Sequence, residues 1–317
     1  MKILLAVDDS PYSERAAQTL RALQLPSQTE VTVMTVVPEH TFLGEISLHM
    51  FRATTGAGKR ADKAQERKAA ELLKKPVEAL RASGVEAESL VCRGRPAEEV
   101  IKQAREIGAH LVVIGAKGEG DPPRFPLGSV AYQVMTHAEA SVLLAREKTT
   151  SIRRVLVATD GSKYSDEVVR FLLDLPLPAK SEVFLVTAMQ SWNPALVKAF
   201  TRDWEIDQQI LRDLQEAERE RAQSLLDETK KRFREKGYQV SSMVLRGEPA
   251  EEILTASETL NPDLIAVGAR GLTGIKALLV GSVAQRVARF SRYSVLIGRA
   301  QGRELSPQES VELGSGE

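Results

Sequence analysis

Residues 93–100 read RGRPAEEV, and residues 246–253 read RGEPAEEI. A match of this length within one chain is unlikely to arise by chance and indicates an internal repeat with an offset of 153 residues. Two further pairs of segments have the same offset: LGSVA at 127–131 with VGSVA at 280–284, and SVL at 141–143 with SVL at 294–296. A third pair, LLAVDDS at 4–10 with LVATDGS at 156–162, has an offset of 152, which implies a length change of one residue in between. The repeat unit has the length of a whole domain, so the chain is predicted to contain two copies of one domain.

The boundary between the two copies is expected in the polar stretch from Arg146 to Arg154, which separates two apolar runs. We predict a first domain over residues 1–147 and a second domain over residues 153–300. Residues 301–317 are rich in Glu, Ser, Gly and Gln and have little to bury, so they are predicted to form a disordered tail. The total length of 317 residues agrees with two domains of roughly 150 residues each.

Short apolar runs alternate with helical patterns in each half. Strands are expected at 3–7, 31–37, 85–92, 111–114 and 142–145, and again at 155–159, 183–188, 239–245, 264–267 and 294–297. Helices are expected in the first half at 12–23, 59–82, 97–107 and 129–136. This alternation predicts an α/β fold in which each half is a doubly wound parallel sheet with right-handed crossovers. The charged segment Glu216–Lys236 is predicted to be an amphipathic helix covering one sheet face, with a partner-binding helix as the alternative.

Composition excludes several classes of protein. Forty-three basic and 43 acidic side chains give a formal net charge of zero, which argues against binding to nucleic acid because a phosphate backbone usually requires a basic face. Cys92 is the single cysteine, and no Cys/His cluster has the spacing of a metal site. No apolar stretch approaches the roughly 18 residues of a membrane span. We therefore expect a soluble, cytoplasmic protein that uses neither nucleic acid nor a membrane as its partner.

An aspartate follows the first expected strand of each half, as DDS at 8–10 and DGS at 160–162. In an open α/β sheet, ligands bind at the carboxyl ends of the strands where the strand order reverses. Ser10 and Ser162 are well placed to cap the helices that follow. Asp8 and Asp160 stand directly at the strand ends, so we expect them to contact a ligand or its metal ion.

A glycine pattern follows the fourth strand of each half, where GAKG at 115–118 and GS at 128–129 correspond to GARG at 268–271 and GS at 281–282. The spacing is Gly-x2-Gly-x9-Gly-Ser in both copies. Glycines let the backbone approach a ligand closely, and a helix that starts at Gly-Ser offers free N–H groups and a partial positive charge to an anion. The pattern therefore favours a polyphosphate ligand, although neither the Walker phosphate loop nor the Gly-x-Gly-x-x-Gly dinucleotide motif is present.

With these motifs, the sequence resembles the universal stress protein family in its tandem two-domain form, from residue 1 to about residue 299. The glycine pattern is that of the family's ATP-binding branch. The resemblance implies a five-stranded sheet of order 3-2-1-4-5 in each half and an adenine nucleotide, ATP or else ADP or AMP, across the ends of strands one, two and four. Carried onto this chain, it places a second site at Asp160, Ala188, Gly268, Arg270, Gly271, Gly281, Ser282 and Val283, and a first site at Asp8, Val37, Gly115, Lys117, Gly118, Gly128, Ser129 and Val130. It also implies an intramolecular pseudo-dimer formed by the last strands, 142–145 and 295–298, and leaves a homodimer of two chains open.

The two expected sites differ in the segment between their glycines. The first half reads EGDPPRFP at 119–126, whereas the second reads LTGIKALL at 272–279, which is the more usual family sequence. Glu119 and Asp121 would repel phosphate unless a metal ion, Lys117 or Arg124 compensated, and three prolines remove N–H donors. Nucleotide binding is therefore expected more strongly at the second site than at the first.

The case for catalysis is weaker than the case for binding. None of His40, His49, His110 and His137 has a counterpart in the other half, so these histidines are expected to have surface or packing roles. Mg²⁺ held by Asp8 or Asp160 and slow ATP hydrolysis would be the most that the sequence supports. Two functions remain: a nucleotide-binding regulatory module whose loops at 38–59 and 190–213 reorganise with ATP, or a nucleotide-independent assembly protein. The downstream protein partner cannot be named from the sequence.

Overall fold

The structure is a computed structural model that describes residues 1–26, 28–38, 57–122, 126–147, 149–175, 177–178, 180–189, 208–271 and 280–299. The predicted tail at 301–317, most of the two predicted mobile loops, His40, His49, Arg124 and the segment 272–279 lie outside these residues. The strands are β1 (Lys2–Ala6), β2 (Glu30–Pro38), β3 (Glu86–Gly94), β4 (Leu111–Gly115), β5 (Ser141–Ala145), β6 (Arg154–Ala158), β7 (Glu182–Met189), β8 (Gln239–Arg246), β9 (Leu264–Gly268) and β10 (Ser294–Gly298). The helices are α1 (Pro11–Ala22), α3 (Ala57–Ala82), α4 (Pro96–Glu106), α5 (Ser129–His137), α6 (Lys163–Asp174), α8 (Gln208–Glu235), α9 (Pro249–Leu260) and α10 (Ser282–Phe290).

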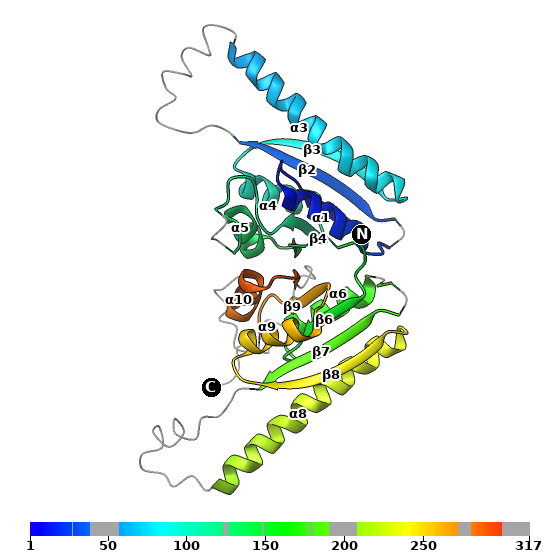
Figure 1. Cartoon of the computed structure of the whole chain (residues 1–317), viewed down its shortest axis with the longest axis vertical. Helices are drawn as coiled ribbons and strands as arrows, with labels where there is room; N and C mark the ends of the chain where they lie inside the picture. The colour runs from blue at the N-terminus through cyan, green and yellow to red at the C-terminus, as the bar shows by residue number, and fades with distance from the viewer. Residues whose placement is uncertain are drawn as a thin grey trace, which may run out of the picture.

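All the strands belong to one ten-stranded sheet of order β3-β2-β1-β4-β5-β10-β9-β6-β7-β8, which runs along the long axis of the molecule (Figure 1). Each half is parallel and has the predicted order 3-2-1-4-5. The halves meet where β5 and β10 pair antiparallel, with Leu143 opposite Leu296. The predicted fold class and the predicted pseudo-dimer through the last strands are both confirmed. We call the two halves the N-terminal lobe and the C-terminal lobe.

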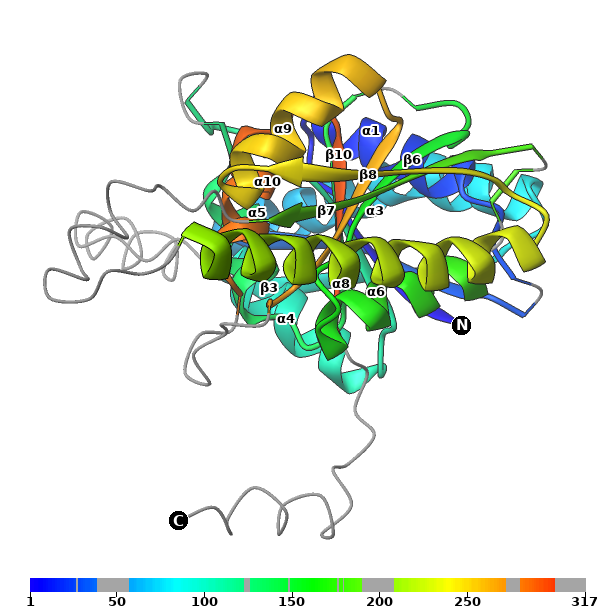
Figure 2. The same cartoon turned by 90° about the horizontal axis from the view of Figure 1, so that it is seen from below.

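Helices cover both faces of the sheet. One buried cluster lies between the sheet and helices α1, α3, α6 and α8, and a second lies between the opposite face and helices α4, α5, α9 and α10. The central strands are mostly apolar because they are covered on both sides, and every residue of β4 and β5 is buried, including Ser141 at the start of β5. Helix α8 lies along β7 and β8 (Figure 2), with Leu226 and Phe233 fully buried beneath its charged outer face. The predicted packing role of this helix is therefore confirmed.

Two arginines form hydrogen bonds between the lobes across the β5–β10 junction. The guanidinium group of Arg146, just after β5, donates to the carbonyl oxygens of Ala288 and Arg289 in the last turn of α10. Reciprocally, the guanidinium of Arg299, just after β10, donates to Met135 and Thr136 in the last turn of α5, at 2.5 and 3.1 Å. Burial lowers the pKa of both arginines to about 10. Each positive charge lies at the negative end of a helix dipole, which favours this arrangement.

Candidate functional site

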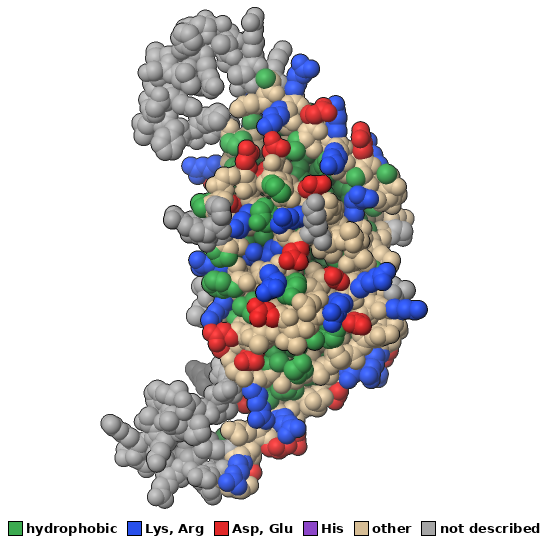
Figure 3. Space-filling view, in the orientation of Figure 1, with side chains coloured by type: hydrophobic (Ala, Val, Ile, Leu, Met, Phe, Trp, Pro, Cys, Tyr) green, Lys and Arg blue, Asp and Glu red, His purple; other side chains and the backbone are tan. Residues whose placement is uncertain are grey.

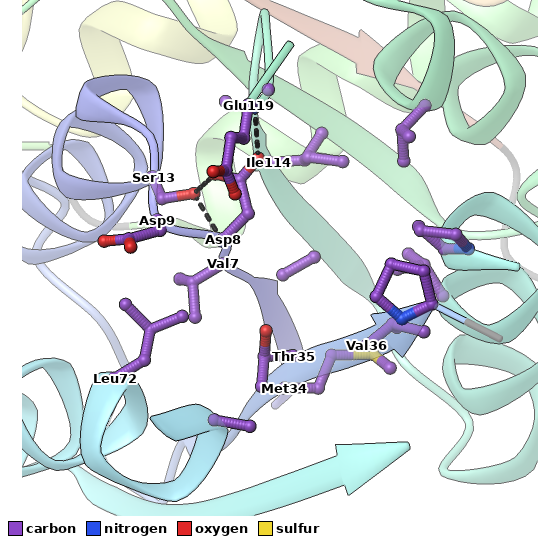
Figure 4. A pocket seen from close by; sticks show the side chains of 18 of the residues that line it. Val7, Asp8, Asp9, Ser13, Met34, Thr35, Val36, Leu72, Ile114 and Glu119 are labelled. Carbon is purple, nitrogen blue, oxygen red and sulfur yellow. Dashed lines mark hydrogen bonds between the residues drawn. The ribbon is translucent and has the colours of Figure 1, made fainter. Parts of the chain in front are cut away.

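A cavity of about 640 Å³ opens at the carboxyl ends of β1, β2 and β4 in the N-terminal lobe (Figure 4). Its volume lies within the range of about 300–1,000 Å³ that is typical of small-molecule sites. Met34 and Val36 from β2, Ile114 from β4 and Leu72 from α3 give it apolar walls. The cavity is therefore at the position where this sheet topology is expected to bind a ligand.

The cavity brings together the residues predicted for the first site. Of that set, it is lined by Asp8, Val37, Gly115, Lys117, Gly118, Ser129 and Val130, and only Gly128 is not among the lining residues. Its lining also contains Asp9, Glu71, Glu119 and Asp121, against the two basic residues Lys68 and Lys117. Among the described lining residues, then, carboxylates outnumber ammonium groups, and their combined charge is unfavourable for a polyanion.

The aspartate after the first strand is held by the turn that follows it in both lobes. Asp8 Oδ1 accepts hydrogen bonds from the backbone N–H of Ser10 (3.1 Å) and the hydroxyl of Ser13, and its Oδ2 accepts from the N–H of Glu119 at 2.8 Å. The repeat places the same turn at Asp160, whose Oδ1 accepts from the N–H of Ser162 at 3.0 Å. Both aspartates thus have a structural role, and their contact with a ligand stays a prediction.

The serines that follow these aspartates cap helices, as the sequence predicts. The hydroxyl oxygen of Ser10 accepts from the N–H of Ser13 at the start of α1, and that of Ser162 accepts from the N–H of Ser165 at the start of α6, at 3.3 and 3.2 Å. Such a cap satisfies one of the N–H groups that a helix start leaves without a partner.

The first glycine of each glycine pattern is explained by helix packing. A Cβ atom at Gly115 would lie 2.7 Å from Cβ of Tyr12, and one at Gly268 would lie 2.8 Å from the backbone N of Ser165. These distances allow α1 to pack on β4 and α6 on β9 only when no side chain is present. The second glycines instead contact the strand-end aspartates, because a Cβ at Gly118 or Gly271 would lie 2.7 Å from Oδ2 of Asp8 or Asp160.

Asp121 occupies the start of helix α5 in the N-terminal lobe. Its Oδ2 accepts from the N–H of Gly118 at 2.7 Å, and its Oδ1 accepts from the N–H of Ser129 at 3.3 Å. A Cβ atom at Gly128 would lie 3.0 Å from Cγ of Asp121 and would overlap its Oδ2. The N–H groups predicted to hold phosphate in this lobe are therefore bound by a carboxylate of the protein itself.

The corresponding region of the C-terminal lobe is open among the described residues. A Cβ atom at Gly281 would have Cα of Arg270 as its nearest described neighbour, at 3.5 Å, and no described side chain caps the start of α10. The guanidinium of Arg270 stacks over the Tyr164 ring, 5.4 Å from its centroid, and donates to the Tyr164 hydroxyl at 3.2 Å. The segment 272–279, which corresponds to 119–126 in the repeat, contains Lys276 and no acidic residue.

Other titratable groups give little indication of catalysis. Among the described residues, no group of three or more His, Cys, Asp or Glu side chains is arranged to hold a metal ion. His110 accepts a hydrogen bond through Nδ1 from the N–H of Lys2 at 3.2 Å, and burial lowers its pKa. Burial likewise raises the pKa of the Cys92 thiol on β3. His110 is thus hydrogen-bonded to the backbone, and its expected surface or packing role stays a prediction, while Cys92 is a partly buried free cysteine.

On the face shown in Figure 3, basic and acidic side chains are interspersed and form no extended area of one sign. In the parts of the chain that the structure describes, no helix is both long and apolar enough to cross a membrane.

The sequence did not predict the position of the Asp121 side chain at the start of α5, or the contacts of Arg146 and Arg299 between the lobes. From the sequence, Asp121 is a charge near the site, whereas the structure places its carboxylate on the N–H groups of the site. The arginines did leave a signal, because Arg146 and Arg299 are separated by 153 residues, the offset of the repeat.

Comparison with known proteins agrees with this architecture. The profile of the Universal stress protein family matches residues 1–146 and 151–299. A universal stress protein of Methanocaldococcus jannaschii is 28% identical over 152 residues, which cover 48% of this chain and 85% of the relative. A universal stress protein of Mycobacterium tuberculosis is 29% identical over 199 residues, which cover 60% of this chain and 62% of the relative, so less than two thirds of that protein is matched.

Solved structures show the same fold over both lobes. The crystal structure of a universal stress protein from Archaeoglobus fulgidus has a TM-score of 0.63 at 20% identity, over 96% of this chain and 97% of that chain. A protein from Pseudomonas aeruginosa, described as functionally unknown, has a TM-score of 0.60 at 14% identity, over 95% of this chain and 92% of that chain. Two copies of the family profile, matched in tandem and joined in one sheet, show that the chain belongs to the universal stress protein family.

Proposed function

We propose that this protein is a nucleotide-binding regulatory module whose C-terminal lobe holds an adenine nucleotide: ATP, or else ADP or AMP, with or without Mg²⁺. The proposal includes a cytoplasmic location. It assigns the chain to the ATP-binding branch of its family, because the glycine pattern of that branch is intact at 268–282. The nucleotide would lie at the carboxyl ends of β6, β7 and β9.

The observation that carries the proposal is the space at Gly281. Its φ of −73° is accessible to any residue, and the nearest described atom to a Cβ there is 3.5 Å away. Neither backbone conformation nor packing against the described residues explains why a glycine stands at this position. Close approach of a ligand does explain it, since phosphate bound at the start of α10 would occupy the place of a side chain.

Charge supports the same assignment. Arg270 lies between the glycines of the pattern, and its guanidinium is fixed against Tyr164. The N–H groups at the start of α10 and the positive end of its dipole would hold the phosphates, and Ala188, the penultimate residue of β7, would contact the adenosine part with its backbone. The contacts proposed here hold the nucleotide and include no group that would react with it. We therefore assign the lobe a binding and signalling role, with slow hydrolysis as the upper limit of activity.

The test is the nucleotide content of the purified protein and its thermal response. We expect adenine nucleotide in the extract, seen by absorbance at 260 nm and by mass, and a rise in unfolding temperature with Mg-ATP, because a ligand that binds the folded state stabilises it. Gly281→Val should remove this rise by filling the place of the phosphate. Met243→Val, at an exposed position on β8, is the control and should keep it.

An unchanged response in Gly281→Val would place the ligand elsewhere. The proposal would be overturned if the extract contained no nucleotide and the unsubstituted protein showed no thermal response to Mg-ATP. That result would favour the alternative function, an assembly protein that needs no nucleotide.

A further inference from the structure

The start of α5 in the N-terminal lobe already contains an anion. The Asp121 carboxylate bridges the N–H groups of Gly118 and Ser129, at 2.7 and 3.3 Å. These are the second glycine and the serine of the glycine pattern. Their counterparts in the C-terminal lobe, Gly271 and Ser282, are the groups assigned to phosphate above.

The position of this carboxylate depends on Gly128. Any side chain at Gly128 would overlap Oδ2 of Asp121, whereas Gly281 has no described atom closer than 3.5 Å to its Cβ position. Both glycines have nearly the same backbone, with φ/ψ of −72°/157° and −73°/160°. The same backbone cradle thus encloses an acidic side chain in one lobe and no side chain of the described residues in the other.

The rest of the cavity is not filled. About 640 Å³ remains beside Asp121, with apolar walls formed by Met34, Val36 and Ile114. Figure 4 shows Met34 and Val36 on β2, apart from the carboxylates of Asp8 and Glu119. Lys68, one of the two basic lining residues, is paired with Asp9 at 2.9 Å. The cavity therefore keeps room for an uncharged, partly apolar ligand and has lost its place for phosphate.

We propose that Asp121 is a built-in substitute for phosphate that makes the N-terminal cavity selective for a nucleoside without phosphate groups and excludes ATP from it. This inference rests on the proposed function, because it compares the N-terminal cavity with a nucleotide site in the other lobe. A phosphate at this position would have to displace the carboxylate from both N–H groups or lie beside it, and two negative charges at contact distance repel strongly.

The experiment is calorimetric titration of the full chain with ATP and, separately, with adenosine. We expect one ATP per chain for the unsubstituted protein and two for Asp121→Ala, with the N-terminal cavity binding ATP at least about tenfold more tightly than before the substitution. Asp121→Ser is the more conservative variant and should act in the same direction. The affinity of the N-terminal cavity for adenosine should change by less than about twofold, because Asp121 lies where phosphate, and not the nucleoside, would be.

Glu119→Gln is the matched control. It removes one negative charge from the same loop and cavity lining, but the side-chain carboxylate of Glu119 does not bind the N–H groups of Gly118 and Ser129. If general acidity excluded ATP, Glu119→Gln would also admit a second ATP, and the specific role of Asp121 would be refuted.

The outcomes separate this inference from the proposed function. Two ATP molecules bound by the unsubstituted protein, or one ATP bound by the unsubstituted protein and still only one by Asp121→Ala and Asp121→Ser, would overturn the inference and leave the C-terminal site standing. No ATP in the unsubstituted protein and one in Asp121→Ala would overturn the C-terminal site and support the inference. No ATP in any variant would overturn both.

Discussion

Alanine at Gly128 and alanine at Gly281 should have different effects on stability, although the two positions are equivalent in the repeat. Both glycines precede a nine-residue helix and have nearly the same φ and ψ. Any cost of placing alanine at the residue before a helix is therefore shared by the two variants. The difference between them reports only what the new methyl group contacts.

The size of that difference follows from the hydrogen bonds of Asp121. A methyl group at Gly128 forces the carboxylate away and breaks its bonds to the N–H groups of Gly118 and Ser129. A hydrogen bond to a charged group contributes about 1.5–3 kcal/mol. The bond to Ser129 is long and exposed, and the displaced carboxylate regains water, so we expect Gly128→Ala to cost about 2 kcal/mol more than Gly281→Ala.

The measurement is urea unfolding followed by circular dichroism, completed as a double-mutant cycle with Asp121→Ala. Once Asp121 is absent, the nearest described neighbour of the methyl group is Cα of Lys117, at 3.1 Å, compared with 3.5 Å to Cα of Arg270 at Gly281, so most of the extra cost of Gly128→Ala should disappear. Equal losses for the two glycines in the unsubstituted background, or a coupling to Asp121 below about 0.5 kcal/mol, would show that the carboxylate is not seated as described.

Two further predictions concern the lobe junction and pH. Arg146→Ala and Arg299→Ala should each lower the free energy of unfolding by about 2–4 kcal/mol, because each leaves two helix-end carbonyls without a buried donor. The control Arg292→Ala, at an exposed ion pair, should cost less than about 0.5 kcal/mol by urea unfolding. Equal losses for all three variants would contradict the capping role. The pKa of His110 is lowered in the folded state, so its contribution to stability is present above its usual pKa of 6.5 and is lost as the pH falls below that value. The unfolding temperature should therefore fall more between pH 7.5 and pH 5.5 in the unsubstituted protein than in His110→Asn, which keeps an acceptor for the Lys2 N–H. An identical fall in the two proteins would refute the role of His110 in this pH dependence.

The fold could be predicted from the sequence because its main determinants are local or repeated. Continuous apolar runs such as 111–114 identify buried parallel strands, and the repeat with an offset of 153 residues shows that the second half must fold like the first. Ser10 and Ser162 act within three residues of their own position, so their capping role was also readable. The pairing of β5 with β10 followed only from the family resemblance, since strand pairing between domains leaves no local pattern.

The details of the N-terminal site could not be predicted because they depend on the path of the backbone. Asp121 reaches Ser129, eight residues away, through a loop in which Gly120 has a φ of +84°. The charge of Asp121 was visible in the sequence, but the direction of its side chain was not. Gly115 shows the same limit, because its lack of a side chain is required by the approach of Tyr12, more than 100 residues earlier in the chain.

Joining the two lobes in one polypeptide has a consequence for how their sites can differ. When two identical subunits pair through the last strand of a sheet, every change in one site appears in the other as well. Here the β5–β10 pairing is intramolecular, so it does not depend on protein concentration, and each lobe has its own sequence. One lobe can therefore acquire an acid such as Asp121 while its partner keeps an unmodified cradle, and under the two proposals made above a single chain would respond to two different small molecules at a fixed ratio of one to one.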